Sequence, residues 1–205
     1  MNRFKALILD LDDTIYPTKS LDKDQVQGFF DALDRYNDSV STEDLQKAKQ
    51  EMWIHPIHVV ARRYEFSQRM YEQSMDFFDR EFKFSIRPFP DYQSLADLKL
   101  PLFLVTTGPT KLQEAKIKSL GIENHFKEII IDDPMAMKGG KVAAFQSLID
   151  RHQLTPSAVL VIGDNPDSEI AAAKDLNIPY ALIDRNNAHQ NTFNSFDSIF
   201  ERLLK

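Results

Sequence analysis

The sequence of 205 residues predicts an α/β fold: a doubly wound, Rossmann-like parallel sheet of about five strands that carries an inserted, all-helical segment. Three observations predict it. Five short apolar runs do not alternate with polar residues, helical patterns separate the last four runs, and a long stretch without any strand signal separates the first two. The five runs are residues 6–9, 102–105, 128–131, 158–162 and 180–183.

Each apolar run is strand-length and rich in Ile, Leu and Val. Runs without alternation suit strands that are buried on both faces, as in a parallel sheet. The helical patterns between them cover residues 110–120, 141–152 and 166–176, and Gly121 is a suitable C-cap for the first of these helices. Strands and helices that alternate in this way indicate a doubly wound sheet.

The stretch between the first two runs is helical instead. Val26, Phe29, Phe30 and Leu33 recur on one helical face, and Ser41 stands where a helix N-cap is expected. Two prolines in the segment SIRPFPDY indicate a linker at the far end. We therefore expect a helical cap over residues 16–87 and an α/β core made of residues 1–15 and 88–205. Phe77, Phe78, Phe82 and Phe84 are expected in the interior of the cap.

Composition excludes several classes of function. The net charge of −6 gives no sign of the basic face that a nucleic-acid polymer would need. The absence of cysteine excludes disulfides, thiolate metal sites and a cysteine nucleophile. No apolar stretch is long enough to span a membrane, and acids follow the N-terminal apolar run where a signal-peptide cleavage site would lie. We expect a cytoplasmic enzyme without a membrane partner, and the sequence does not give its oligomeric state.

Each apolar run ends in polar residues. The ligands of an open α/β sheet bind at the carboxyl ends of its strands, so the polar residues at these ends are expected to converge. They include Asp10, Asp12, Thr106 and Asp164. Several carboxylates in one place suit a divalent cation, and an oxygen-rich site suits Mg²⁺.

The spacing of the first two acids suggests a reaction. Residues i and i+2 of an extended strand end share a face, so Asp10 and Asp12 can both face a ligand. One carboxylate could attack phosphorus and form an aspartyl phosphate, while the other serves as general acid and then as base. Thr106 could donate a hydrogen bond to a phosphoryl oxygen, and a nearby lysine could neutralise the developing charge.

Three segments resemble motifs of the haloacid dehalogenase superfamily, in the same order along the chain. LILDLDDTIYP resembles the first motif, FLVTTG the second and VLVIGDNPDSEIAAAK the fourth. The helical stretch after the first motif resembles the C1 cap of this superfamily. The resemblance implies a phosphatase, because the dehalogenases of the superfamily generally lack the second acid, Asp12.

The resemblance also implies roles for particular residues. Asp10 is expected as nucleophile and Mg²⁺ ligand, Asp12 as acid/base and as metal ligand through its backbone carbonyl, and Asp164 as the remaining protein ligand. Thr106, Thr107 and Gly108 are expected to bind the substrate. The lysine of the third motif is Lys141 or Lys138, with Lys141 favoured because it precedes Phe145 by four residues.

Two further points stay open on the sequence alone. Glu169 stands where the fourth motif often has a second Asp, and it could reach the metal through water or form a salt bridge with Lys141. The expected substrate is a small phosphorylated metabolite: a nucleotide, a sugar phosphate or a phosphorylated acid. Plausible contacts for it are Tyr16, Lys19, Trp53, His55, Arg62 and Arg63.

Three other functions compete with the phosphatase. A phosphomutase would use the same residues and return the phosphoryl group to a sugar. A receiver-like signalling domain would also carry an aspartyl phosphate, but on its third strand and without a cap. A binding protein that has lost its activity is disfavoured by the intact acids and Thr106.

Overall fold

The computed structural model describes residues 3–136, 139–185 and 192–204 and contains the expected parallel sheet. Its strand order is β3-β2-β1-β4-β5, and every neighbouring pair is parallel. The strands are β1 (Ala6–Leu9), β2 (Leu102–Thr107), β3 (Glu128–Asp132), β4 (Val159–Gly163) and β5 (Tyr180–Leu182). The apolar runs predicted these strands within two residues at each end.

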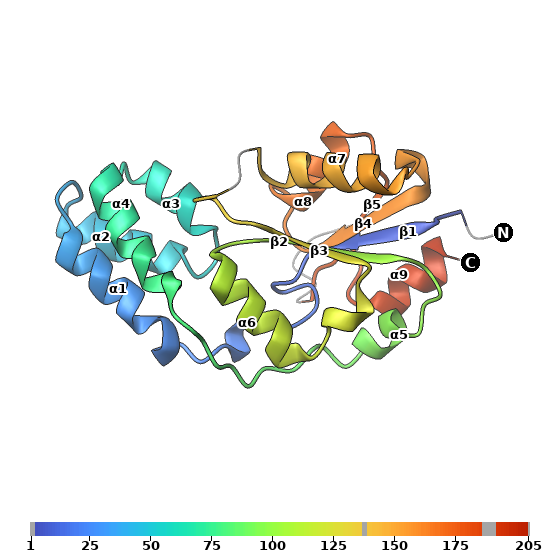
Figure 1. Ribbon diagram of the computed structural model, residues 1–205, viewed down its shortest axis with the longest axis horizontal. Coiled ribbons are helices and arrows are strands. Elements are labelled where there is room, and N and C mark those ends of the chain that lie inside the picture. Colours follow the sequence, from blue (N-terminus) through green and yellow to red (C-terminus); the bar gives the residue numbers. More distant parts are fainter. Residues whose placement is uncertain (1–2, 137–138, 186–191, 205) are drawn as a thin grey trace.

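Helices cover both faces of the sheet, which confirms the doubly wound architecture (Figure 1). On one face lie α7 (Gly140–His152) and α8 (Glu169–Asp175), which pack on a core that includes Ile8, Phe103 and Val161. On the other lie α5 (Tyr92–Ala96), α6 (Thr110–Leu120) and α9 (Phe196–Leu203), which pack on Leu7 and Leu104. Successive residues of β1 therefore serve opposite cores, as alternation along a strand requires.

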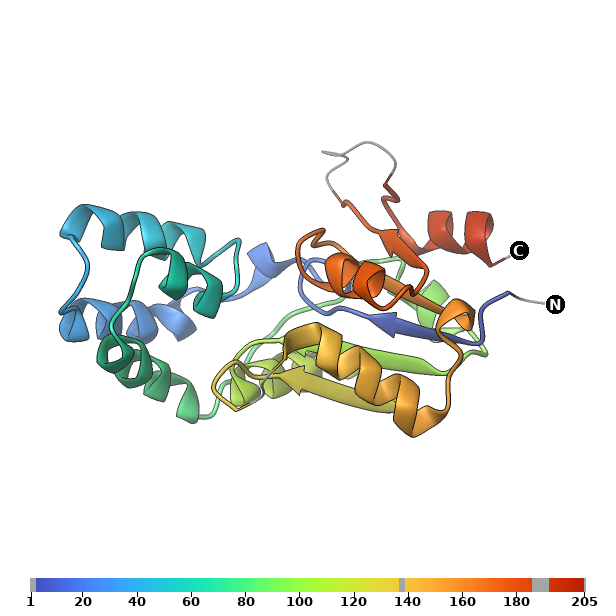
Figure 2. The ribbon, with the colours of Figure 1, turned by 90° about the horizontal axis from the view of Figure 1, so that it is seen from above.

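Residues 24–79 of the segment between β1 and β2 form a helical lobe beyond the carboxyl ends of the strands (Figures 1 and 2). It contains α1 (Asp24–Tyr36), α2 (Thr42–Glu51), α3 (Ile57–Arg63), α4 (Gln68–Met75) and the short 3₁₀-helix η2 (Asp76–Asp79). We call this segment the helical lobe. Its own apolar cluster contains the expected face of α1, with Phe78 and Phe82. The expectation that residues 16–87 form a C1-type cap remains a prediction.

Local signals account for the ends of several helices. Ser41 is the N-cap of α2, and its side chain accepts a hydrogen bond from the amide of Asp44, at 3.1 Å. Gly121 ends α6 in the left-handed conformation, with φ of 66°, which glycine adopts at little cost. α7 begins at Gly140, one residue before the predicted start, so Lys141 lies in its first turn.

The two connections between the lobe and the sheet lie side by side. The amide of Phe89 donates a hydrogen bond of 2.8 Å to the carbonyl of Ile15. The chain thus leaves and re-enters the core through two neighbouring segments. Their contact at Ile15 and Phe89 lies close to the predicted boundaries at residues 15 and 88. Among the described residues, no helix combines the length and the apolar character that crossing a bilayer would require.

Candidate active site

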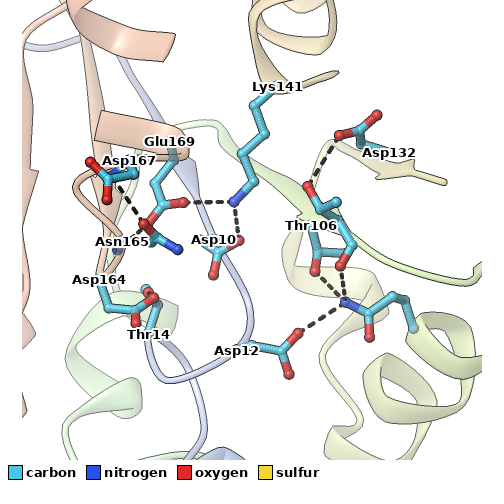
Figure 3. A network of polar contacts seen from close by, with 12 residues as sticks. Asp10, Asp12, Thr14, Thr106, Asp132, Lys141, Asp164, Asn165, Asp167 and Glu169 are labelled. Atoms are coloured by element: carbon cyan, nitrogen blue, oxygen red, sulfur yellow. Dashed lines mark hydrogen bonds and ion pairs between the residues drawn. The ribbon is translucent and has the colours of Figure 1, made fainter. Parts of the chain in front are cut away.

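The carboxyl ends of the strands meet at one cavity, as the sequence predicts. Asp10 follows β1, Thr106 lies at the end of β2, Asp164 follows β4, and Lys141 comes from the first turn of α7. The cavity has a volume of about 360 Å³, and residues of the helical lobe line its other side. Figure 3 shows the polar side chains that form its floor.

Lys141 lies between two acids at the centre of this floor. Its ammonium contacts Asp10 Oδ1 at 2.5 Å and Glu169 Oε2 at 2.8 Å, and all three side chains are buried. Burial alone would lower the pKa of Lys141, but the charges of Asp10 and Glu169 outweigh it and raise that pKa. Lys141 is therefore a fixed cation beside Asp10. Its alternative, Lys138, lies outside the described residues.

Glu169 forms the salt bridge with Lys141, one of the two roles left open by the sequence. Its other oxygen, Oε1, accepts a hydrogen bond from the amide of Asn165 at 2.6 Å. Gly163 makes room for it, because a Cβ at this position would lie 2.2 Å from Glu169 Cγ. The longer Glu side chain thus requires a glycine at the end of β4.

Three carboxylates form a group that fits a divalent cation. One oxygen each of Asp10, Asp164 and Glu169 lie within 4.8 Å of one another. Burial, with the charges of Glu169 and Asp12, outweighs Lys141 and raises the pKa of Asp10 to about 7. Burial, with the charges of Asp10 and Glu169, raises the pKa of Asp164 to about 8. Crowded carboxylates of this kind gain from a bound cation, and all-oxygen ligands are those that Mg²⁺ prefers. The donor set therefore fits Mg²⁺.

Asp12 lies opposite this group and is held by three donors. Its Oδ1 accepts hydrogen bonds from Tyr16 Oη at 2.6 Å and from Lys116 Nζ at 2.8 Å, and its Oδ2 accepts one from Gln113 Nε2 at 2.9 Å. Burial would raise the pKa of Asp12. The charge of Lys116 and the three hydrogen bonds outweigh burial and lower that pKa.

The residues at the end of β2 are engaged in different ways. Thr106 is buried, lines the cavity and accepts a hydrogen bond from Gln113 Nε2 at 2.6 Å. The hydroxyl of Thr107 donates to Asp132 Oδ2 at 3.1 Å, and the Gly108 amide donates to the Asp132 carbonyl. Gly108 has φ of 149°, which favours glycine. The structure thus brings all three predicted residues to the cavity, with the Thr107 hydroxyl already bound to Asp132.

The cavity also shows which of the candidate substrate contacts are placed to reach a ligand. Tyr16, Lys19, Trp53 and His55 line it. Arg62 and Arg63 do not: both are exposed on the helical lobe, and Arg63 pairs with Glu51. Tyr16 is fully buried, and its hydroxyl is bound to Asp12, so its role is to support Asp12.

Sequence reasoning missed the two residues of α6 that contact Asp12, Gln113 and Lys116. They lie three positions apart on the helix that follows the end of β2, so they share the face that looks back toward the strand ends. Their spacing was visible in the sequence. Which face of the helix is buried became visible only with the packing of α6 against both the sheet and the lobe.

Comparison with known proteins gives the family. A family model for haloacid dehalogenase-like hydrolases matches residues 4–177, which include every site residue described above. The chain belongs to the haloacid dehalogenase-like hydrolase family. The resemblance of its three motifs is thereby confirmed, and the receiver-like alternative has no support.

The relatives of this haloacid dehalogenase-like hydrolase include phosphatases. A glyceraldehyde 3-phosphate phosphatase of Methanopyrus kandleri is 25% identical over 185 residues, 82% of this chain and 79% of that protein. A phosphoglycolate phosphatase of Vibrio vulnificus is 30% identical over 71 residues, 35% of this chain and 31% of that protein. The crystal structure of a HAD phosphatase from Thermococcus onnurineus has a TM-score of 0.66 at 20% identity, with 98% of each chain covered. The chain is an enzyme, a phosphoric monoester hydrolase of this family.

Replacing Lys141 tests how much the buried ion pairs contribute to stability. We expect Lys141→Met to lower the free energy of unfolding by about 3–5 kcal/mol, because it leaves Asp10 and Glu169 buried without their cation. Lys47→Met is the matched control, since the Lys47–Glu43 pair is exposed to solvent and its loss should change the stability little. Urea unfolding in the presence of a chelator measures both. Equal losses of unfolding free energy in the two variants would show that the buried ion pairs stabilise the protein no more than an exposed pair does.

Proposed function

We propose that the protein is a Mg²⁺-dependent phosphatase that hydrolyses a small phosphorylated metabolite through an aspartyl phosphate on Asp10. The observation that carries this proposal is the convergence of Asp10, Asp12, Thr106, Lys141 and Asp164 on one cavity. The family and its phosphatase relatives support the same reaction.

In the first step, a carboxylate oxygen of Asp10 attacks the phosphorus atom, and the bond from phosphorus to the ester oxygen breaks. Asp12 must enter this step protonated, although the donors around it lower its pKa in the free site, and it gives that proton to the leaving oxygen; the second step returns a proton to it. Thr106 donates a hydrogen bond to a phosphoryl oxygen, and Lys141 offsets negative charge between Asp10 and the phosphoryl group. Lys141 also keeps the Asp10 carboxylate in a fixed orientation through their contact of 2.5 Å.

In the second step, Asp12 takes a proton from a water molecule, which attacks the phosphorus of the aspartyl phosphate. The bond between phosphorus and Asp10 breaks, which restores the carboxylate and releases inorganic phosphate. Asp10, Asp164 and the backbone carbonyl of Asp12 would hold Mg²⁺. A bound Mg²⁺ supplies positive charge that offsets the charge of the phosphoryl oxygens.

The wall that the helical lobe contributes to the cavity favours an uncharged substrate body. Among the described residues, the part of this wall that belongs to the lobe is largely apolar, with His55 and His58 but no acid and no arginine. Its apolar members include Phe30, Trp53, Ile57 and Met75, and Leu112 of α6 lies beside them. Its cations, Lys19 and Lys23, come from the connection to β1. A carboxylate placed against the apolar wall would lose water without gaining a partner. A ring-sized apolar group would gain from burial there.

The relatives named above act, by their names, on two small phosphorylated compounds, glyceraldehyde 3-phosphate and phosphoglycolate. A cavity of about 360 Å³ lies within the range of about 300–1,000 Å³ that is usual for larger ligands. We therefore propose that this enzyme prefers a phosphate ester with a larger and less charged alcohol than phosphoglycolate. Release of inorganic phosphate also separates this proposal from the phosphomutase alternative, which would form a phosphate isomer instead.

Replacing the nucleophile tests the reaction itself. We expect Asp10→Asn to lower kcat by at least about 10³-fold, because the amide cannot form the aspartyl phosphate. Asp167→Asn is the matched control: it changes an exposed acid in the loop after β4 and should keep kcat within about twofold. Phosphate release measures both, and circular dichroism checks their fold. Turnover by a folded Asp10→Asn variant at the parent rate would contradict the mechanism.

Adding Mg²⁺ tests the cation site. At a concentration about 100 times its Kd, Mg²⁺ should stabilise the protein by about 2.7 kcal/mol. For a chain of this length the melting temperature should then rise by about 5–10 °C. Asp164→Asn should remove most of the shift, whereas Asp167→Asn should keep it. Differential scanning calorimetry with Mg²⁺ or with chelator measures the shift, and an unchanged Tm at saturating Mg²⁺ would argue against the site.

Two substrates of different character test the preference of the cavity. We expect kcat/KM for benzyl phosphate to exceed that for phosphoglycolate by at least about 10-fold, because burial of a ring-sized group contributes about 1.5–3 kcal/mol. Trp53→Ala should lower the value for benzyl phosphate and leave that for phosphoglycolate within about twofold. Val59→Ala is the control, since Val59 is a half-exposed apolar residue of α3 outside the cavity. A preference for phosphoglycolate would reverse the proposed substrate class.

A further inference from the structure

Two side chains of α6 are buried against Asp12 although both are polar. Gln113 and Lys116 are 1% and 7% exposed, and they lie three residues apart on one face of the helix. Lys116 Nζ contacts Asp12 Oδ1 at 2.8 Å, and Gln113 Nε2 contacts Asp12 Oδ2 at 2.9 Å. Each oxygen of the Asp12 carboxylate thus has its own donor from α6.

Burial of these groups is costly for a helix that could have carried apolar residues at both positions. An ammonium or an amide removed from water costs stability unless it gains hydrogen bonds inside the protein. Lys116 gains its ion pair with Asp12. Gln113 gains hydrogen bonds to Asp12 and Thr106. Its side-chain carbonyl oxygen, Oε1, is buried without a hydrogen-bond partner among the described residues. The arrangement is thus better suited to holding Asp12 than to stabilising α6.

Gln113 joins two residues of the proposed reaction. The same amide nitrogen donates to Thr106 Oγ1 at 2.6 Å and to Asp12 Oδ2 at 2.9 Å. Thr106 is expected on a phosphoryl oxygen and Asp12 on the leaving oxygen, which are bonded to the same phosphorus atom. A single side chain therefore fixes the distance between the two groups that must contact neighbouring atoms of the substrate.

The helix that carries these residues is itself held on two sides. Leu112 belongs to the apolar cluster of the helical lobe, and Ile117 belongs to the core under the sheet. Gln113 and Lys116 lie between them in the sequence. Since α6 packs against both the helical lobe and the core, the side chains that donate hydrogen bonds to Asp12 have a fixed position relative to the sheet.

We propose that Gln113 and Lys116 are positioning residues, which hold the Asp12 carboxylate where it can exchange a proton with the leaving oxygen of the substrate. The proposal rests on the proposed phosphatase reaction. Neither residue is assigned a contact with the reacting atoms; both act through Asp12, with Tyr16 as a third donor to the same carboxylate.

The test compares two substrates that differ in their need for a proton. The nitrophenolate of p-nitrophenyl phosphate leaves without one, whereas the alkoxide of propyl phosphate needs it. We expect Lys116→Met to raise the ratio of kcat/KM for p-nitrophenyl phosphate to that for propyl phosphate by about 10-fold or more. Gln113→Met should raise the ratio in the same direction, with an added loss on both substrates through Thr106.

Controls separate positioning from a general structural effect. Lys118→Met makes the same change at an exposed position of α6 and should leave the ratio within about twofold. Lys116→Arg keeps the cation and should keep most of the parent ratio. In an Asp12→Asn background, Lys116→Met should not raise the ratio further, because it acts through Asp12.

The outcomes are distinct. Equal losses on both substrates in Lys116→Met and Gln113→Met, or no loss on either, would overturn the positioning role. If one of these variants does not fold, as judged by circular dichroism, the other decides, since each leaves one donor on Asp12. If the parent protein releases phosphate from neither substrate with Mg²⁺ present, the proposed function fails, and this inference fails with it.

Discussion

The site depends on the balance of charge around Lys141. Asp10 and Glu169 are buried, and each would be costly in that place without a cation. Lys141 contacts both, and it comes from the first turn of α7, just after two glycines with positive φ. The ammonium of Lys141 therefore allows Asp10 after β1 and Glu169 of α8 to lie close together beside α7.

A second dependence runs through α6. This helix begins three residues after the end of β2, packs under the sheet and also contacts the apolar cluster of the helical lobe. Its polar face supplies the donors to Asp12. The proposed nucleophile and the proposed acid/base are thus supported by different helices: Asp10 through α7 and Asp12 through α6. Each can be perturbed separately, which makes their contributions to the reaction separable by mutation.

Much of this arrangement could be predicted from the sequence, for a physical reason. Strands buried on both faces leave continuous apolar runs, and the polar residues at their carboxyl ends must gather at one edge, so Asp10, Thr106 and Asp164 could be placed together. Gln113 and Lys116 could not be placed, since a polar residue on a helix is usually exposed. Only the three-dimensional packing shows that this face of α6 is buried.

Most charged groups of the cavity lie at its floor, where the reaction is proposed, and most of its apolar groups lie in the wall that would select the substrate. Among the described groups in contact at the floor, the carboxylates of Asp10, Asp12, Asp164 and Glu169 outnumber the ammoniums of Lys116 and Lys141 by two to one. A phosphate dianion would add to this excess, so its binding requires a further cation, which the proposed Mg²⁺ provides. The described residues with which the helical lobe lines the cavity include no acid and no arginine, so this wall is suited to recognise the rest of the substrate by shape, apolar burial and a few hydrogen bonds. Changes in that wall should therefore alter which ester is hydrolysed and leave the chemistry at Asp10 intact.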